Sequence, residues 1–184
     1  HETESLKTRL FSINHQQNYG SDSHWELSSF YRRNSDYYVY QREKPAIYTA
    51  NHETKSGAVA FAGKHELSET LAINHSAQFT ADSIDSTSLE EGDFTSRSYI
   101  KISVLPEYCL QLEENEALTL RVGATFDDTN RDSSEVSPIA DITWEHSDTN
   151  GQSEKVYLSY AQATQVAGYG AIGGSESGRF ASNY

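Results

Sequence analysis

Apolar and polar side chains alternate every two residues in several long segments of this chain. The segments 71–80, 99–104 and 118–127 show the pattern most clearly. Because successive side chains of a strand point to opposite faces, each segment predicts a β-strand with one apolar and one polar face. We expect the following side chains to form one continuous apolar surface: Leu71, Ile73, Phe79, Ile100, Ile102, Val104, Leu118, Leu120, Val122, Phe126, Ile142, Trp144, Val156 and Leu158.

The whole chain can be divided into about eight such strands, and helical periodicity is absent. The predicted fold is therefore all-β, an up-and-down antiparallel meander of the membrane β-barrel type. Residues 1–184 would form a single β-barrel domain or barrel segment, either a closed small barrel or part of a larger one. The strands are expected near 4–14, 24–34, 52–63, 70–80, 97–108, 117–127, 138–146 and 155–163.

The predicted connections alternate between short and long. Short polar turns fall at 64–69, 113–116 and 147–154, the last with Asn150-Gly151, a strong hairpin signal. Longer loops are expected at 35–51, 81–96, 128–137 and 164–184. This alternation is typical of outer-membrane barrels, which have short turns at one end and long loops at the other. We expect the loops 81–96, 128–137 and 164–184 to leave one end of the sheet, opposite the turns 64–69, 113–116 and 147–154.

Composition narrows the possible partners. No stretch has the ~20 apolar residues that a membrane helix needs, but barrel strands carry a much weaker signal. A net charge of −13 argues against nucleic acid as a partner, because phosphate contacts need clustered Lys and Arg. Cys109 is the single cysteine, so no disulfide can form within one chain. Many of the twelve tyrosines lie near strand ends, as in the aromatic belts of membrane barrels.

Candidate catalytic and metal chemistry is poor. None of the common nucleophile, zinc or phosphate-loop motifs occurs, and we expect neither an enzyme nor a cofactor. Asp128-x-Asn130-x-Asp132 resembles the opening of a calcium loop. However, Ser133 stands where the turn glycine belongs and Ile139 where the bidentate glutamate belongs. A solvated acidic loop without a metal ion is the expected structure here.

The C-terminal third of the sequence resembles a known family. The segment 155–169 reads Lys-Val-Tyr-Leu-Ser-Tyr-Ala-Gln-Ala-Thr-Gln-Val-Ala-Gly-Tyr. It looks like a strand and loop of TonB-dependent outer-membrane receptors, which commonly read Tyr-x-Ser-Tyr-Ala and then Gln-Val-x-Gly-Tyr. The segments 137–144 and 178–183 suit the neighbouring stretches of that family, so the resemblance covers roughly 117–183.

The resemblance implies a location in the bacterial outer membrane and a role in energised uptake. The ligand would be an iron chelate, cobalamin or a carbohydrate, and outer-membrane lipid would surround the barrel. The family has an N-terminal plug, a TonB box and about 22 strands, none of which this chain shows in full. We expect the chain to cover about a third of such a barrel and to need the remaining barrel and plug, or self-association, because open sheet edges are not tolerated in lipid.

A ligand site, if the chain forms one, is expected at the long-loop end. The candidate ligand-binding side chains are Tyr99, Arg121, Arg131, Gln165 and Tyr169. Two other interpretations stay open. The chain could be a complete eight-stranded outer-membrane barrel with a structural or adhesion role, or a soluble β-barrel or sandwich that binds a ligand or glycan. An apolar set packed inside a closed core would favour the soluble protein.

Overall fold

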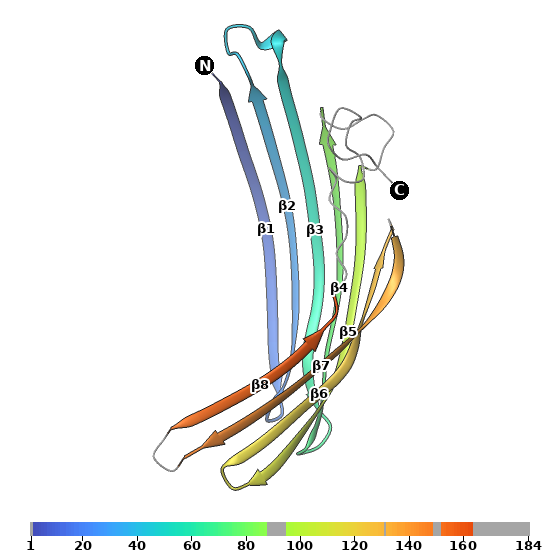
Figure 1. Cartoon of the computed structure of the whole chain (residues 1–184). Helices are drawn as coiled ribbons and strands as arrows, with labels where there is room; N and C mark the ends of the chain where they lie inside the picture. Colours follow the sequence, from blue (N-terminus) through green and yellow to red (C-terminus); the bar gives the residue numbers. More distant parts are fainter. Residues whose placement is uncertain (1, 88–94, 131, 149–151, 164–184) are drawn as a thin grey trace.

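In a computed structural model, the described residues form one large antiparallel sheet and a single short helical turn, η1 (Pro45–Ile47) (Figure 1). The structure describes residues 2–87, 95–130, 132–148 and 152–163. The strands are β1 (Thr3–Tyr19), β2 (Ser23–Val39), β3 (Thr49–Glu66), β4 (Leu71–Ser86), β5 (Ser96–Glu113), β6 (Glu116–Thr129), β7 (Asp132–Ser147) and β8 (Ser153–Ala161).

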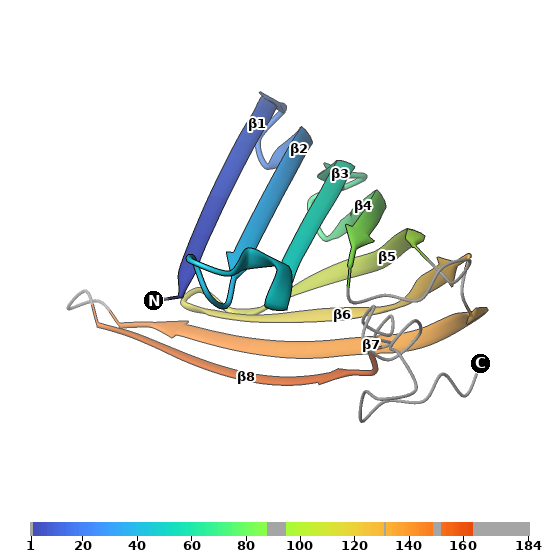
Figure 2. The same ribbon diagram turned by 90° about the horizontal axis from the view of Figure 1, so that it is seen from above.

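The sheet is an up-and-down meander. Its spatial order is β1-β2-β3-β4-β5-β6-β7-β8, so every strand pairs with its neighbours in the sequence. The predicted all-β antiparallel meander is therefore confirmed. The sheet curves, but β1 and β8 lie at its two edges and are not paired with each other (Figure 2). The sheet is open, and the barrel stays a prediction.

The strands are longer than the sequence pattern predicts. The loop expected at 128–137 is wrong, because β7 begins at Asp132 and pairs closely with β6 through Phe126 and Val136. The loops expected at 35–51 and 81–96 are also too long, since β2 runs to Val39 and β4 runs to Ser86. In these stretches polar side chains predominate on both faces, so the sequence shows no apolar alternation. The backbone pairing nevertheless continues.

The connections alternate between the two ends of the sheet, because each strand runs antiparallel to the one before it. The strand ends around 40–48, 87–95 and 130–131 lie at one end, together with the end of β8. The turns at 20–22, 67–70 and 114–115 lie at the other end, together with the end of β7 and the start of β8. Within the described residues, the connection 40–48 contains one element of regular structure, the helical turn η1. The predicted loop 164–184 lies outside the described residues.

The register places the predicted apolar set on one face of the sheet. Leu120, Ile142 and Leu158 are direct partners across β6, β7 and β8, and Phe79 and Ile100 are partners across β4 and β5. We call the face of the sheet that carries this set the apolar face. The opposite, polar face carries the side chains predicted for it: Asn74, Gln78, Lys101, Thr119, Arg121, Asp141 and Thr143.

Burial is inverted relative to a water-soluble sandwich. On the apolar face Val122 is 65 % exposed and Leu158 is 73 % exposed. The polar face instead holds buried polar side chains, namely Glu107, Thr125, Asp127, Ser137 and Thr143. Among the described residues, the buried hydrophobic side chains are limited to one valine and three alanines. The apolar set is therefore not packed inside a closed core.

A sharp bend separates two parts of the sheet. Pairing between β5 and β6 is regular up to Val104 and Ala124 and resumes at Glu107 and Arg121. Pro106 lies in the gap and has no backbone N–H to donate. A Cβ atom at Gly123 would lie 2.0 Å from the carbonyl oxygen of Val104, so only glycine permits this close approach. Figure 1 shows β6 and β7 curving strongly, whereas β1 and β2 are straighter.

Candidate functional site

A charged cluster lies on the polar face at the level of this bend, centred on Glu107. The residue is 7 % exposed. Its Oε1 lies 2.8 Å from Lys64 Nζ, and its Oε2 lies 2.6 Å from Arg121 Nε. Asn74 Nδ2 donates a third hydrogen bond to Oε2 at 3.0 Å. Three neighbouring strands, β3, β4 and β6, thus supply donors to one carboxylate of β5.

The ion pairs continue outward from Glu107 in both directions. Lys64 also contacts Asp22 in the β1–β2 turn, and Arg121 Nη1 lies 3.1 Å from Asp141 Oδ1 on β7. We call these five charged residues the polar-face cluster. Each of its two cations contacts two carboxylates, so no member is left without an opposite charge. Such pairing is required when charged groups are removed from water.

A hollow of about 310 Å³ lies beside this cluster, over β6, β7 and β8. Arg121 and Asp141 form one side of it, and hydroxyl groups form much of the rest. The hollow offers hydrogen-bond donors and acceptors but no nucleophile paired with a base, so it is suited to binding a polar ligand or water. Its lining consists of Thr119, Arg121, Asp141, Thr143, Glu145, Lys155, Tyr157 and Ser159.

Tyr99 belongs to a second polar pair, separate from the polar-face cluster. Its hydroxyl donates to Asp127, which is 2 % exposed and also lies 3.4 Å from Lys101 Nζ. Tyr99 is the register partner of Thr129, eight residues along β6 from Arg121. The structure therefore does not bring the two candidate ligand residues Tyr99 and Arg121 together. The other three candidates, Arg131, Gln165 and Tyr169, lie outside the described residues.

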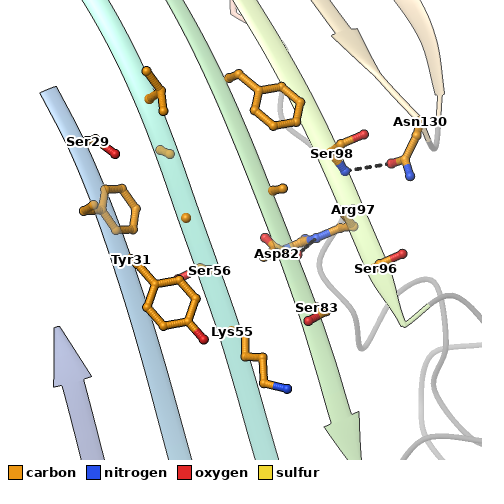
Figure 3. A pocket seen from close by; sticks show the side chains of 16 residues that line it. Ser29, Tyr31, Lys55, Ser56, Asp82, Ser83, Ser96, Arg97, Ser98 and Asn130 are labelled. Carbon is orange, nitrogen blue, oxygen red and sulfur yellow. Dashed lines mark hydrogen bonds and ion pairs between the residues drawn. The ribbon is translucent and has the colours of Figure 1, made fainter. Parts of the chain in front are cut away.

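A groove of about 620 Å³ lies on the opposite, apolar face, across β2 to β5 (Figure 3). Small side chains form its floor, because Gly57, Ala81 and Ser98 are successive register partners on β3, β4 and β5, and Tyr31 lies beside Gly57 on β2. The adjacent row contributes apolar side chains, including Val59 and Phe79. On the polar face behind this groove, Asp82 and Arg97 are register partners, and they pair at 2.8 and 3.0 Å (Figure 3).

A second hollow on the apolar face is strongly basic. It measures about 150 Å³ and is lined by Lys7, Arg9, Arg33 and Ser35 of β1 and β2. We call these four residues the basic cluster. Arg9 and Arg33 are direct register partners, and Arg33 is the partner of Lys55 on β3.

One carboxylate faces the basic cluster from β3. Glu53 lies 2.5 Å from Arg33 Nη2 and 3.2 Å from Lys55 Nζ. The hydrogen bond from Arg33 lowers the pKa of Glu53, with a further contribution from Lys55, and it raises the pKa of Arg33 in return. In the described residues, no carboxylate contacts Lys7 or Arg9.

The structure also identifies residues that the sequence analysis did not select. Glu107 and Lys64 stand out only once the strands are in register. Regular pairing outward from Glu113 and Glu116 would place Tyr108 opposite Arg121, and the irregularity between Gln111 and Glu113 shifts the register so that Glu107 becomes the partner. A second register shift, between Asp127 and Thr129, likewise places Arg121 opposite Asp141. The contact with Lys64 crosses two strands, and no single hairpin predicts it.

The calcium-like segment 128–132 does not form an acidic loop. Asp128 lies within β6, and the side-chain oxygen of Asn130 accepts a hydrogen bond from the backbone N–H of Ser98 at 2.9 Å. In the part of the chain that the structure describes, no group of three His, Cys, Asp or Glu side chains is placed to hold a metal ion. Cys109 is a free thiol near the hydroxyl of Thr119.

No helix within the described residues has the length and apolar character needed to cross a membrane. Comparisons of the chain with known protein families, with curated proteins and with solved structures give no match.

Proposed function

We propose that this chain forms part of the wall of an outer-membrane β-barrel of the TonB-dependent receptor type, which captures a small ligand and takes part in its uptake. One observation carries the proposal. Within the described residues, the sheet has an exposed apolar face and a polar face with ion pairs around the buried Glu107, and it has no apolar core. This is the polarity of a wall between lipid and an aqueous lumen, and it is the reverse of a soluble barrel.

The length of the apolar stretches agrees with this proposal. On the apolar face they extend over 71–81, 100–110, 118–126 and 136–144. A tilted strand needs roughly 9–11 residues to cross the hydrocarbon layer, and each of these stretches has that length. The strands themselves are longer, with 16 residues in β4 and 18 in β5. Their remaining residues would extend beyond the membrane.

The polar face supplies the surface that a passing ligand would meet. The polar-face cluster and the hydroxyl-lined hollow offer charged and neutral hydrogen-bonding groups. The ligand class, an iron chelate, cobalamin or a carbohydrate, rests on the resemblance of 155–169 to the receptor family. Arg121 is the described residue that we expect to contact a ligand, because it lines the hollow and has 37 % of its side chain exposed.

A second candidate is a complete eight-stranded outer-membrane barrel. The single meander of eight strands favours it. The unpaired β1 and β8 edges favour a wall segment that pairs with further barrel strands. A soluble ligand- or glycan-binding module would require a cover for the apolar face, and none of the described residues provides one.

Two neighbouring substitutions on β8 test the membrane placement. Leu158 lies on the apolar face and Ser159 on the polar face, and both are exposed. A charge in the hydrocarbon layer costs roughly 2–4 kcal/mol. Leu158→Arg should therefore lower the ratio of vesicle-bound to free chain by at least about tenfold in a flotation assay, whereas Ser159→Arg should leave it unchanged. Equal binding of the two variants would contradict the proposal.

A further inference from the structure

We propose that the basic cluster binds the phosphate of a membrane lipid head group, and that an acyl chain of the same lipid lies in the apolar groove beside it. The proposal rests on the proposed function, because it requires the apolar face to contact lipid. It goes further by naming a specific lipid site on that face. The site lies where the exposed apolar side chains of the face end, on the side of the sheet where β1 begins.

The first argument is the charge balance of the basic cluster. Arg9, Arg33 and Lys55 stand side by side on three adjacent strands, and like charges directly opposite each other destabilise a sheet. Glu53 neutralises one charge by contacting Arg33 and Lys55. Lys7 and Arg9 contact no carboxylate in the described part of the chain, although the chain has 27 acidic and 14 basic residues. This concentration of unneutralised positive charge indicates an external anion.

The second argument is the shape and donor content of the hollow. Its volume of about 150 Å³ lies between two arginines, a lysine and the side chain of Ser35. Arg33 Nε is buried and has no hydrogen-bond partner, so its N–H is left without an acceptor. Phosphate oxygens accept several charge-assisted hydrogen bonds at once, and arginine matches their geometry well.

The third argument is the position of the hollow relative to the apolar band. The next apolar-face residue after Arg9 on β1 is Phe11, and the next after Arg33 on β2 is Tyr31. Phe11 is 69 % exposed and Tyr31 is 49 % exposed. The cations therefore end the apolar band at the level where a lipid places its head group.

The fourth argument selects a lipid over a free phosphate ion. Tyr31 and Lys55 line the groove of about 620 Å³ (Figure 3). The register partners Val59 and Phe79 also line it. Gly57 opposite Tyr31 and Ala81 opposite Gly57 leave room above the sheet for a chain of methylene groups. A basic hollow followed directly by an apolar groove matches a phosphate attached to an acyl chain.

The test uses the full chain in neutral dodecyl maltoside micelles. The probes are dioctanoyl phosphatidic acid and dioctanoylglycerol, which differ only in the phosphate, and inorganic phosphate as a third arm. Native mass spectrometry counts the bound lipids during titration. We expect phosphatidic acid to bind at least about tenfold more tightly than dioctanoylglycerol, and inorganic phosphate to displace it poorly.

The variant K7Q/R9Q should remove most of that preference. Both residues are exposed and make no ion pair within the described residues, so the sheet should still form, which circular dichroism checks. The matched control is R32Q, because Arg32 is exposed on the opposite face of β2 and does not line the hollow. R32Q should bind phosphatidic acid as the unchanged chain does.

The outcomes separate this proposal from the proposed function. Equal binding of the two lipids, or an equal loss in R32Q, would overturn the head-group site while leaving the barrel wall intact. Displacement of phosphatidic acid by a similar concentration of inorganic phosphate would show that the basic cluster binds a free anion. It would overturn the claim that the bound molecule is a lipid. A chain that binds neither lipid and does not float with vesicles would overturn the proposed function itself.

Discussion

The polar-face cluster and the basic cluster both contain lysine and arginine, but they differ in burial and in the number of carboxylates that balance these charges. Glu107 in the first is 7 % exposed and receives three donors. Lys7 and Arg9 in the second are exposed and contact no carboxylate among the described residues. Among the described residues, every charged side chain of the polar-face cluster contacts an opposite charge, whereas two cations of the basic cluster contact none.

The difference follows from solvation. Charges removed from water must be neutralised by the protein, because an unpaired buried charge is very costly. Exposed cations are stabilised by water and can remain available to an external anion. We therefore expect substitutions in the polar-face cluster to change the stability of the sheet, and substitutions in the basic cluster to change lipid binding with little effect on stability.

Removing the charge of Glu107 should have the largest effect on stability. Glu107→Gln keeps the shape of the side chain but leaves Lys64 and Arg121 short of a carboxylate. We expect the free energy of unfolding to fall by about 2–3 kcal/mol, less than for a fully buried pair because the Arg121 side chain is partly exposed. Denaturant unfolding in neutral micelles, followed by circular dichroism, measures this loss.

Glu145→Gln is the matched control for that substitution. Glu145 pairs with Lys155 at a site where both side chains are at least half exposed. Its loss should lower the free energy of unfolding by less than about 1 kcal/mol. Similar losses in Glu107→Gln and Glu145→Gln would show that burial does not distinguish the polar-face cluster from an ordinary surface pair.

Gly123→Ala should have the next largest effect on stability. Gly123 lies at the bend next to the polar-face cluster, where β6 closely approaches β5. The new methyl group would meet the carbonyl oxygen of Val104, and β6 would have to move away from β5. We expect a loss of about 1–3 kcal/mol in the free energy of unfolding. Gly57→Ala is the control, since its nearest neighbour, the carbonyl oxygen of Phe30, would lie 3.3 Å away. An equal loss in both variants would argue against a special role for the bend.

The smallest predicted effect concerns Glu53 and sharpens the description of the basic cluster. Glu53 competes with an external anion for Arg33, so Glu53→Gln should raise the affinity for phosphatidic acid by roughly threefold, the factor expected for one exposed ion pair. Arg33, Lys55 and the cross-strand neighbour Asp85 are the charged groups that face Glu53. An unchanged affinity would show that Arg33 does not contribute to the lipid site.

The same pair gives a pH dependence with a defined sign. Arg33 and Lys55 hold the pKa of Glu53 below its ordinary value. The stabilisation by this pair is therefore complete above the ordinary glutamate pKa and is lost as the pH falls through the lowered value. Across that range, the lipid affinities of the unchanged chain and of Glu53→Gln should converge. Titration of both proteins by native mass spectrometry checks this, and a constant ratio of affinities would contradict it.

Much of this fold could be predicted from the sequence, because alternation of side chains directly reports a two-faced strand. The eight strands and the faces of Leu120 and Arg121 follow from it. The extensions of β2, β4 and β7 could not be predicted in this way, since both faces are polar there and only backbone pairing defines the strand. The loop expected at 128–137 failed for this reason.

The candidate site was less predictable than the fold. Arg121 was selected from the sequence, and it does line a polar hollow. Tyr99 was selected as a ligand contact, but its hydroxyl is bound to Asp127. Glu107 and the basic cluster were missed because their grouping depends on the exact register within a hairpin, and Lys64 was missed because its contact with Glu107 skips a strand. Such register is set by strand length and by bends such as the one at Pro106.

The central claim, that the apolar face contacts lipid, can be tested with the two tryptophans of the chain. Trp25 on β2 and Trp144 on β7 both lie on the apolar face, far apart across the sheet. The measurement is fluorescence quenching in vesicles of brominated phosphatidylcholine, with W25F and W144F isolating each signal. We predict that brominated lipid quenches both tryptophans strongly and that aqueous iodide quenches them weakly. Strong quenching by iodide with no effect of brominated lipid would contradict the account.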